Sequence, residues 1–261
     1  MSRLDLIDLG YLVAAVLFIM GLKGLGRPRT ARRGNLLGAS GMLVAVLVTL
    51  LNQDILTYTM LALALAIGTV LGALLALKVK MTSMPELVAL FNGFGGGASV
   101  LVATASFIEV VDLNAHTTQI SVAAAVTAFI GAVTLTGSMI AFGKLQGSFK
   151  WSGFPGLFLV RAASLLVALP LTVLLVIQPE TQGWLWALVA AGFILGVLGT
   201  VPIGGADMPV VIALLNALSG VAASTTGFVL DNPLLIIAGS LVGASGLVLT
   251  QVMCKAMNRS L

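Results

Sequence analysis

Long apolar segments follow one another along almost the whole chain, and short breaks of glycine, proline and charged residues separate them. Each segment is about 17 to 25 residues long, which is the length that a helix needs to cross about 30 Å of hydrocarbon. An outer-membrane barrel would instead show shorter segments of alternating polarity. The pattern predicts nine membrane-spanning helices, at about 6–22, 35–51, 55–77, 85–107, 119–143, 161–177, 184–200, 209–229 and 233–253.

The composition agrees with this fold class, since 59% of the residues are hydrophobic and only 8% are charged. Such a chain cannot cover itself with a polar surface, so we expect one all-α integral membrane domain over 1–261, held in the lipid bilayer, with no soluble domain of any size. The one cysteine, Cys254, excludes an internal disulfide and a multi-cysteine metal or iron–sulfur site. The N-terminus lacks the basic region of a signal peptide, so we expect the first span to be retained.

The basic residues predict the orientation of the nine spans. Threading the chain through the membrane places every Lys and Arg except Arg3 on one side, whereas every acid except Glu86 and Asp207 falls on the other. Because cytoplasmic loops hold the positive charge, the N-terminus is predicted outside and the C-terminus in the cytoplasm. The net charge of +4 follows from this asymmetry and gives no reason to expect nucleic acid as a partner.

The chain contains an internal repeat. The first copy, at 84–98, reads MPELVALFNGFGGGA, and it aligns without gaps with MPVVIALLNALSGVA at 208–222. Both copies open a predicted span on the cytoplasmic side, with a proline at a first helical position, where its missing N–H costs nothing. Both carry the only asparagine of their span, Asn92 in the first copy and Asn216 in the second. These features favour a true repeat over chance similarity between apolar segments.

Three spans present small and polar residues along one helical face. At about 1.5 Å per residue, Asn92 and Asn216 lie about 10 Å inside the cytoplasmic end of their spans, and Ser138 on the fifth span falls at nearly the same depth. The stripes read Asn92, Gly96, Ser99, Ala103 and Ser106; Thr127, Gly131, Thr134 and Ser138; and Asn216, Ser219, Gly220, Ala223 and Gly227. Such residues are also ordinary contacts between membrane helices. Two asparagines in register inside spans favour a polar pathway through Asn92, Ser138 and Asn216.

The glycines of the first copy do not form a dinucleotide-binding loop. That fingerprint needs a preceding strand and a helix N-terminus that faces water, whereas 93–97 lie two turns inside a span. Their spacing matches the small-x-x-x-small pattern of closely packed membrane helices. We expect no catalytic, cofactor-binding or metal-binding residue in this chain. We expect helix packing from Gly93, Gly96, Gly97, Gly220, Gly239 and Gly243.

The ionisable residues lie near the ends of the spans. Glu86 and Asp207 stand at predicted helix N-termini on the cytoplasmic side, where the helix dipole stabilises a carboxylate; alternatively, they meet a cytoplasmic domain or a proton. His116, the only histidine, falls in an outer loop and is interpreted as a solvated residue. The membrane interior therefore offers no titratable group, so a proton path would need water or a partner chain.

Four regions closely resemble the membrane part of the beta subunit of the proton-translocating nicotinamide nucleotide transhydrogenases. They are GGADMPVV with LNALSG at 204–220, GAVTLTGSMIAFGKL at 131–145, MPELVA at 84–89 and MCKAMNRS at 253–260. The resemblance runs from about residue 80 to the C-terminus, and GGADMP and CKAMNRS are its specific parts. Nine spans also agree with that subunit.

The resemblance implies the proton-conducting membrane domain of an enzyme that passes hydride between NAD(H) and NADP(H). The hydride chemistry then takes place outside this chain, in the NAD-binding domain of the alpha subunit and in an NADP-binding domain that in the family continues beyond the position of Leu261. The chain would thus be a membrane portion that contacts the membrane helices of the alpha subunit. The whole enzyme would be a dimer in the bacterial cytoplasmic (inner) membrane.

The resemblance also implies roles for single residues. Asn216 matches the family's functional asparagine, Ser138 matches a serine of the same region, and Asn92 falls where many members carry a proton-path histidine. Asparagine takes up no proton at neutral pH, so we expect the relay histidine from the alpha subunit; alternatively, water and backbone carry more of the path. Coupling to the NADP-binding domain is implied for Asp207, Glu86 and Arg259.

Two other classes of protein remain as alternatives. A small secondary transporter with parallel repeats would also carry a polar site, but Pro170 is the only clear break within a span, and the asparagines lie nearer the cytoplasm than the midplane. A purely structural subunit of a larger respiratory complex would use the polar residues only for helix packing.

Overall fold

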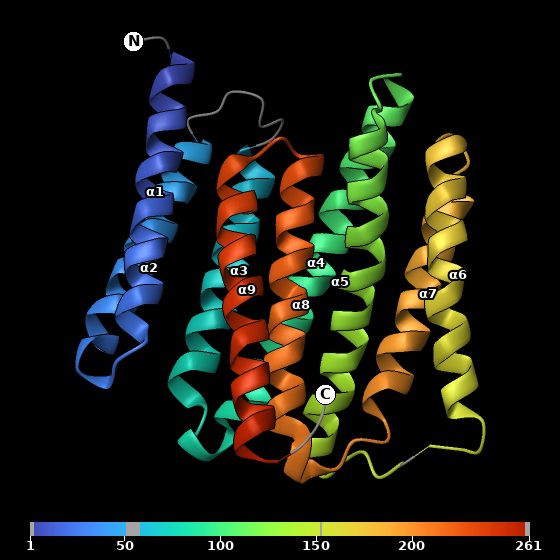
Figure 1. Cartoon of the computed structure of the whole chain (residues 1–261). Coiled ribbons are helices and arrows are strands. Elements are labelled where there is room, and N and C mark those ends of the chain that lie inside the picture. Colours follow the sequence, from blue (N-terminus) through green and yellow to red (C-terminus); the bar gives the residue numbers. More distant parts are fainter. Residues whose placement is uncertain (1–2, 51–57, 152, 259–261) are drawn as a thin grey trace. The chain divides into compact units, whose positions relative to one another are not determined.

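The structure is a computed structural model that describes residues 3–50, 58–151 and 153–258. Within these residues it contains nine α-helices, each long and apolar enough to cross a membrane, and no strand (Figure 1). The helices are α1 (Arg3–Leu25), α2 (Pro28–Leu50), α3 (Tyr58–Lys78), α4 (Met84–Asp112), α5 (Thr118–Leu145), α6 (Leu157–Ile177), α7 (Gly183–Thr200), α8 (Met208–Val229) and α9 (Pro233–Ala256). Two short 3-10 turns, η1 (Met81–Ser83) and η2 (Gly205–Asp207), directly precede α4 and α8. For the described residues, the predicted all-α class is confirmed, and so is the number of helices long and apolar enough to cross a membrane.

Several helices extend beyond the apolar segments that predicted them. α2 begins at Pro28, whereas its predicted span begins at 35, and α4 continues to Asp112 rather than to 107. Proline is favoured in a first helical turn and arginine is a good helix former, so the basic stretch before the second span is helical as well. Hydropathy therefore locates the part of a helix that can lie in hydrocarbon, and backbone preferences decide where the helix ends.

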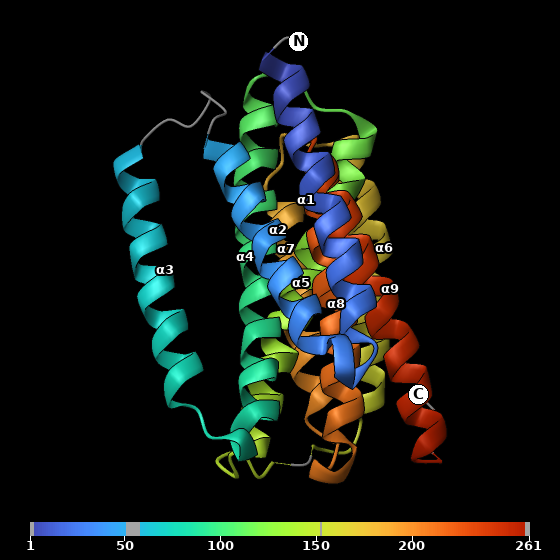
Figure 2. The same ribbon diagram turned by 90° about the vertical axis from the view of Figure 1, so that its left-hand side faces the viewer.

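The chain divides into two compact units, Met1–Met84 and Pro85–Leu261. In the first unit, α1 and α2 form a closely packed hairpin (Figure 2). A Cβ atom added to Gly24 of α1 would lie 2.7 Å from the Cα atom of Gly34 of α2, so only glycine permits this approach of the two backbones. The third helix of the unit, α3, has no buried residue.

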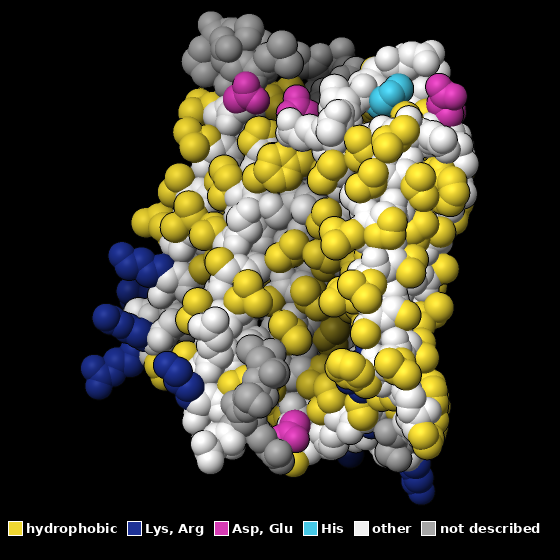
Figure 3. All heavy atoms as spheres, turned by 45° about the vertical axis from the view of Figure 1, so that its right-hand side comes forward, with side chains coloured by type: hydrophobic (Ala, Val, Ile, Leu, Met, Phe, Trp, Pro, Cys, Tyr) yellow, Lys and Arg dark blue, Asp and Glu magenta, His cyan; other side chains and the backbone are white. Residues whose placement is uncertain are grey.

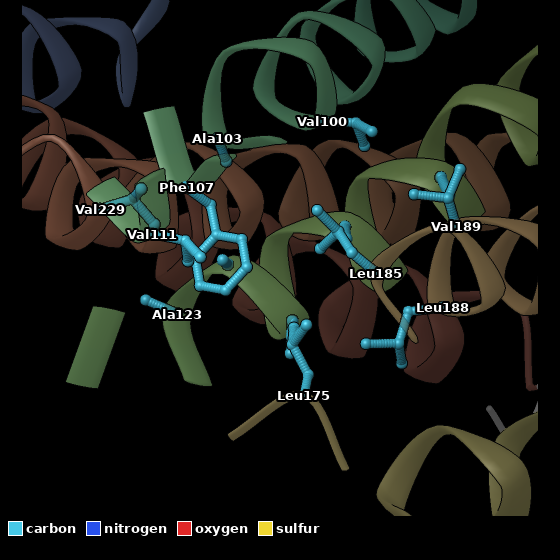
Figure 4. Packing of buried hydrophobic residues seen from close by; sticks show 14 residues of the cluster. Val100, Ala103, Phe107, Val111, Ala123, Leu175, Leu185, Leu188, Val189 and Val229 are labelled. Atoms are coloured by element: carbon cyan, nitrogen blue, oxygen red, sulfur yellow. The ribbon is translucent and has the colours of Figure 1, made fainter. Parts of the chain in front are cut away.

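The second unit contains α4 from Pro85 onward together with α5 to α9. α5 packs against α6, α7 and α8, while α8 also packs against α9 and α6 against α7. Two apolar clusters fill this unit. The larger cluster draws on all five helices from α4 through α8, and it includes Phe107, Leu175, Leu185, Leu188 and Val229 (Figure 4). The smaller cluster joins the first turns of α4 and α8 to the last turns of α5 through Ala89, Ala141, Met208, Ile212 and Leu215.

Two cations close the C-terminal end of α7. Lys144 of α5 donates from Nζ to the carbonyl oxygens of Val201 and Ile203, and Arg161 of α6 donates from Nε to the carbonyl oxygen of Leu198 at 2.9 Å. The last carbonyl groups of a helix lack intrahelical donors and attract positive charge. These two basic residues therefore have a local structural role in addition to their contribution to the charge asymmetry.

Candidate functional site

Glycines of α4 allow its backbone to approach α5. A Cβ atom added to Gly96 would lie 2.7 Å from the Cβ atom of Thr134 and 2.8 Å from the carbonyl oxygen of Gly131. One added to Gly93 would lie 3.0 Å from the Cβ atom of Ser138. The small stripes predicted on the fourth and fifth spans therefore face each other, with Gly96 opposite Thr134 and Gly93 opposite Ser138.

Asn92 connects α4 to α8. Its side chain is only 7% exposed, and its Nδ2 atom donates to the carbonyl oxygen of Ile212 at 3.3 Å. Ile212 precedes Asn216 by one helical turn. Gly95 and Ser219 occupy the same position in the two sequence copies, and a Cβ atom added to Gly95 would lie 2.7 Å from Ser219 Oγ. α4 and α8 thus run parallel and in register, and the two asparagines lie within about one turn, roughly 5 Å, along the helices.

Ser138 is fully buried, at 0% exposure, and its Oγ atom has no hydrogen-bond partner among the described residues. Several other buried hydroxyls behave differently, although Thr104 Oγ1 is likewise buried without a partner among the described residues. Thr127, Thr134 and Thr250 each donate to the carbonyl oxygen one turn earlier, at 2.8 Å. A buried polar atom without a partner is rare in proteins and calls for an explanation such as a water molecule or a functional group. The Ser138 hydroxyl, which lies beside Gly93, is therefore a candidate functional group.

Asn216 lies on α8 near the level of Ser138. A Cβ atom added to Gly137, the neighbour of Ser138, would lie 3.0 Å from Cδ2 of Leu215, the neighbour of Asn216. Asn216 is half-buried, and no described residue forms a hydrogen bond with its side-chain amide. Asn92 and Ser138 thus lie where α4 meets α8 and α5, and Asn216 lies on α8 one turn after Ile212, on the same helical face as Ser219; we call these three residues the polar junction.

Apolar layers lie on both sides of the polar junction. Along α4, Asn92 lies between Ala89 of the smaller apolar cluster and Val100 of the larger one. Along α5, the same two clusters lie on either side of Ser138. Figure 4 shows the larger cluster, in which Phe107 is completely buried. Asn92 and Ser138 are thus enclosed within the helix bundle of the second unit, whereas Asn216 is half-buried.

The structure divides the small stripe that the sequence predicts on the eighth span. Ser219 faces α4, whereas Gly220 packs against the backbone of Gly243 in α9. Gly239 of α9 lies against the backbone of Ser224. A Cβ atom added to Gly227 would lie 2.7 Å from the backbone nitrogen of Ile236 in α9. The stripe therefore does not face one neighbour along its whole length, because α9 occupies the side of α8 that carries Gly220 and Gly227.

One polar contact between α5 and α8 was not predicted. The Oγ1 atoms of Thr127 and Thr225 share a hydrogen bond of 2.7 Å. Thr127 belongs to the predicted stripe, but Thr225 does not, because at 3.6 residues per turn it lies on the opposite side of α8 from Asn216. A second partner for Thr127 could be found only once the packing of α5 against α8 was known.

The predicted coupling residues lie at the starts of α4 and α8. Glu86 is half-buried in the first turn of α4. Asp207 is half-buried at the end of η2, and its side chain forms no capping hydrogen bond with α8. Each copy of the repeat thus begins in the same way, with a 3-10 turn followed by Met and Pro. Arg259 lies outside the described residues.

His116 lies in the turn between α4 and α5, away from the polar junction in the sequence. The residue is half-buried, and its Nδ1 atom is enclosed without a hydrogen-bond partner among the described residues. The interpretation of His116 as a solvated loop residue is therefore wrong for this atom.

The described part of the chain holds no cluster of metal-ligating side chains, and a groove beside α4 and α5 is apolar. The described residues contain no group of three His, Cys, Asp or Glu residues that could hold a metal ion. A groove of about 320 Å³ runs along α4, α5 and α7, where it is lined by apolar residues such as Leu135, Val189 and Phe193. An apolar groove of this kind suits lipid or another helix and offers nothing to a charged ligand.

The fold and the polar junction define a class of protein: over its described residues, a helical protein with nine apolar helices and a polar junction on three of them. Comparison with known proteins narrows this class. The model of the family described as "NAD(P) transhydrogenase beta subunit" matches residues 7–261. The chain belongs to this family.

Relatives in this family resemble the chain along nearly all of its length. The protein named NAD(P) transhydrogenase subunit beta from Rhodospirillum rubrum is 46% identical over 264 residues, which cover 96% of this chain and 55% of the relative. The same subunit from a defined strain of that species matches equally well. The chain therefore spans about half the length of the curated relatives that it matches.

Proposed function

We propose that this chain is the proton-conducting membrane domain of an NAD(P) transhydrogenase. Hydride transfer between NAD(H) and NADP(H) would take place in partner cytoplasmic domains and would be coupled to proton movement through the second unit. Membership of the beta-subunit family supports this assignment. The NADP-binding domain would belong to the part of the relatives that this chain does not span.

The observation that carries the proposal is the polar junction. Among the described residues, buried Ser138 Oγ has no hydrogen-bond partner and the Asn216 amide forms no hydrogen bond, while apolar clusters lie on both sides. Neither group can take up a proton at neutral pH, but both can hold water by donating and accepting hydrogen bonds. A titratable group from the alpha subunit, a histidine in our proposal, would complete the relay. The apolar clusters would prevent an open leak.

Coupling would be a shift between two populations of the enzyme. The NADP-binding domain would contact the ends of α4, α8 and α9 through Glu86, Asp207 and Arg259. Its affinity for these ends would differ between the oxidised and the reduced nucleotide. This difference in binding free energy would change the side of the membrane to which the relay opens. The proposal places the N-terminus outside, the C-terminus in the cytoplasm and the whole enzyme, as a dimer, in the bacterial inner membrane. The clustering of Lys and Arg supports this orientation.

Substitution of Asn216 tests the proposal in the complete enzyme reconstituted into liposomes. We expect Asn216→Leu to lower proton-coupled turnover by about a hundredfold, the size of a lost proton-transfer step, because leucine cannot hold water at the polar junction. Proton movement is followed with a pH-sensitive dye, and hydride transfer is followed by nucleotide absorbance. Nucleotide binding and assembly should remain unchanged.

Asn35→Leu provides the matched control, since Asn35 is exposed on α2. Ser138→Ala should lower coupled turnover as well, by about tenfold. Full coupling in both Asn216→Leu and Ser138→Ala would leave the polar junction only a packing role and would refute the proposal.

A further inference from the structure

A pocket of about 610 Å³ lies in the first unit, where α1 ends and α2 begins. Three cationic side chains line it: Lys23 in the last turn of α1, Arg27 in the connecting turn and Arg33 in α2. The stretch 23–33 contains five Lys and Arg residues and no acidic residue. Figure 3 shows Lys and Arg side chains projecting together from a mainly apolar surface.

The three cations have no anionic partner in the described part of the chain. No described carboxylate forms an ion pair with Lys23, Arg27 or Arg33, and their side chains form no hydrogen bond with a described residue. This distinguishes them from Lys144 and Arg161, which donate to carbonyl oxygens at the end of α7. Like charges held together repel each other, so an anion bound between them would be stabilised by all three.

The turn beneath the pocket is held by other groups. Thr30 Oγ1 lies 2.7 Å from the carbonyl oxygen of Gly24 and 3.2 Å from that of Arg27, in donor position to both. Gly24 and Gly34 keep the two backbones in contact. Because threonine and the glycines close the turn, the cationic side chains are left available to a ligand, and the pocket exists before the ligand binds.

The pocket also has an apolar wall. Met20 lies about one turn before Gly24 on α1, and Leu37 lies about one turn after Arg33 on α2, so both stand on the side of the pocket toward the apolar centre of the helices. A small inorganic anion would leave this wall unused. A phospholipid would use both parts, because its phosphate needs cations and its acyl chains need apolar side chains.

We propose that this pocket is a binding site for the phosphate headgroup of an anionic phospholipid. Lys23, Arg27 and Arg33 hold the phosphate, and Met20 and Leu37 contact the acyl chain. Basic pockets between membrane helices on the cytoplasmic side are suited to such headgroups. The proposal is independent of the function of the polar junction, since it depends only on the α1–α2 hairpin lying in a membrane.

The experiment compares two pairs of substitutions in the intact enzyme purified in mild detergent. The pocket pair is Arg27→Gln with Arg33→Gln, and the control pair is Arg29→Gln with Arg32→Gln, which removes the same charge from the same hairpin but not from the pocket lining. Native mass spectrometry measures the retention of phosphatidylglycerol and of phosphatidylcholine with the same acyl chains. We expect the wild type and the control pair to retain phosphatidylglycerol preferentially, and the pocket pair to retain about tenfold less.

Four results would overturn the proposal. Equal losses in both pairs would mean diffuse attraction without a site, and equal retention of the two lipids by the wild type would mean no selectivity for anions. Displacement of phosphatidylglycerol by millimolar inorganic phosphate would mean a site for the free anion. Intact lipid retention combined with loss of the nucleotide-binding domains in the pocket pair would assign the hairpin to protein docking instead. Thermal unfolding checks each variant, and Lys23→Gln replaces the pocket pair if that pair does not fold.

Discussion

α4 and α8 begin alike but have different surroundings. Each follows a 3-10 turn, opens with Met and Pro and carries an asparagine at the same position. Asn92 is buried and bonded to the backbone of α8, whereas Asn216 is half-buried and has no hydrogen bond from a described residue. The same residue type therefore connects helices in the first copy and presents an open amide in the second. A repeated motif does not by itself imply a repeated role.

The neighbours of each helix explain this difference. α8 is held by α9, through the backbone contact of Gly220 with Gly243, and by α5, through the hydrogen bond between Thr127 and Thr225. α4 has its close backbone contact with α5 at Gly96. Since α8 is already anchored on two sides, Asn216 is not needed to hold it in place. Asn92, in contrast, supplies a hydrogen bond between α4 and α8.

The largest effect is expected where a side chain would enter a backbone contact. Gly220→Leu should destabilise the second unit by about 3 kcal/mol, because the added atoms meet the backbone of Gly243, which cannot move aside. Gly96→Leu should cost less, because part of its contact is with the Thr134 side chain. Thermal unfolding of the enzyme in detergent measures both variants.

Gly199→Leu is the matched control for these two variants, since a Cβ atom added there meets nothing within 4 Å. If Gly96→Leu destabilised the unit as much as Gly220→Leu, the view that α8 is the more firmly anchored of the two helices would be wrong.

A smaller effect should separate the two asparagines. Asn92→Leu should lower the free energy of unfolding by about 1 kcal/mol, since it removes the bond to the Ile212 carbonyl. Asn216→Leu should leave stability nearly unchanged while it lowers proton-coupled turnover. Detergent titration monitored by circular dichroism provides the stability measurement. Equal destabilisation by the two substitutions would mean that the asparagines share one structural role.

The smallest effect should come from the hydrogen bond between α5 and α8. A double-mutant cycle with Thr127→Val and Thr225→Val should give a coupling energy of about 0.6 kcal/mol, the typical value for a hydrogen bond between membrane helices. A coupling energy near zero, measured by the same unfolding assay, would mean that this hydrogen bond does not help to hold α8 against α5.

Much of the polar junction could be predicted because its members follow simple periodicities. The equal spacing of Asn92 and Asn216 from their Met-Pro pairs predicts equal depth, and the position of Ser138 on an antiparallel span predicts the same level. The contacts of Gly93 with Ser138 and of Gly95 with Ser219 agree with that arrangement. Periodicity could not reveal Thr225 or the open Ser138 hydroxyl, because both depend on which residue of a neighbouring helix lies opposite.

The sequence by itself determined the number of apolar helices and the spacing of their polar residues. It could do so because the length of an apolar segment and the period of a helix are local properties of the chain. Only the tertiary structure decided that α9 takes the glycine side of α8, that Asn92 bonds to Ile212, and that Lys144 and Arg161 close the end of α7. Small residues permit close approach to many partners, so the choice among partners is made when whole helix surfaces pack together.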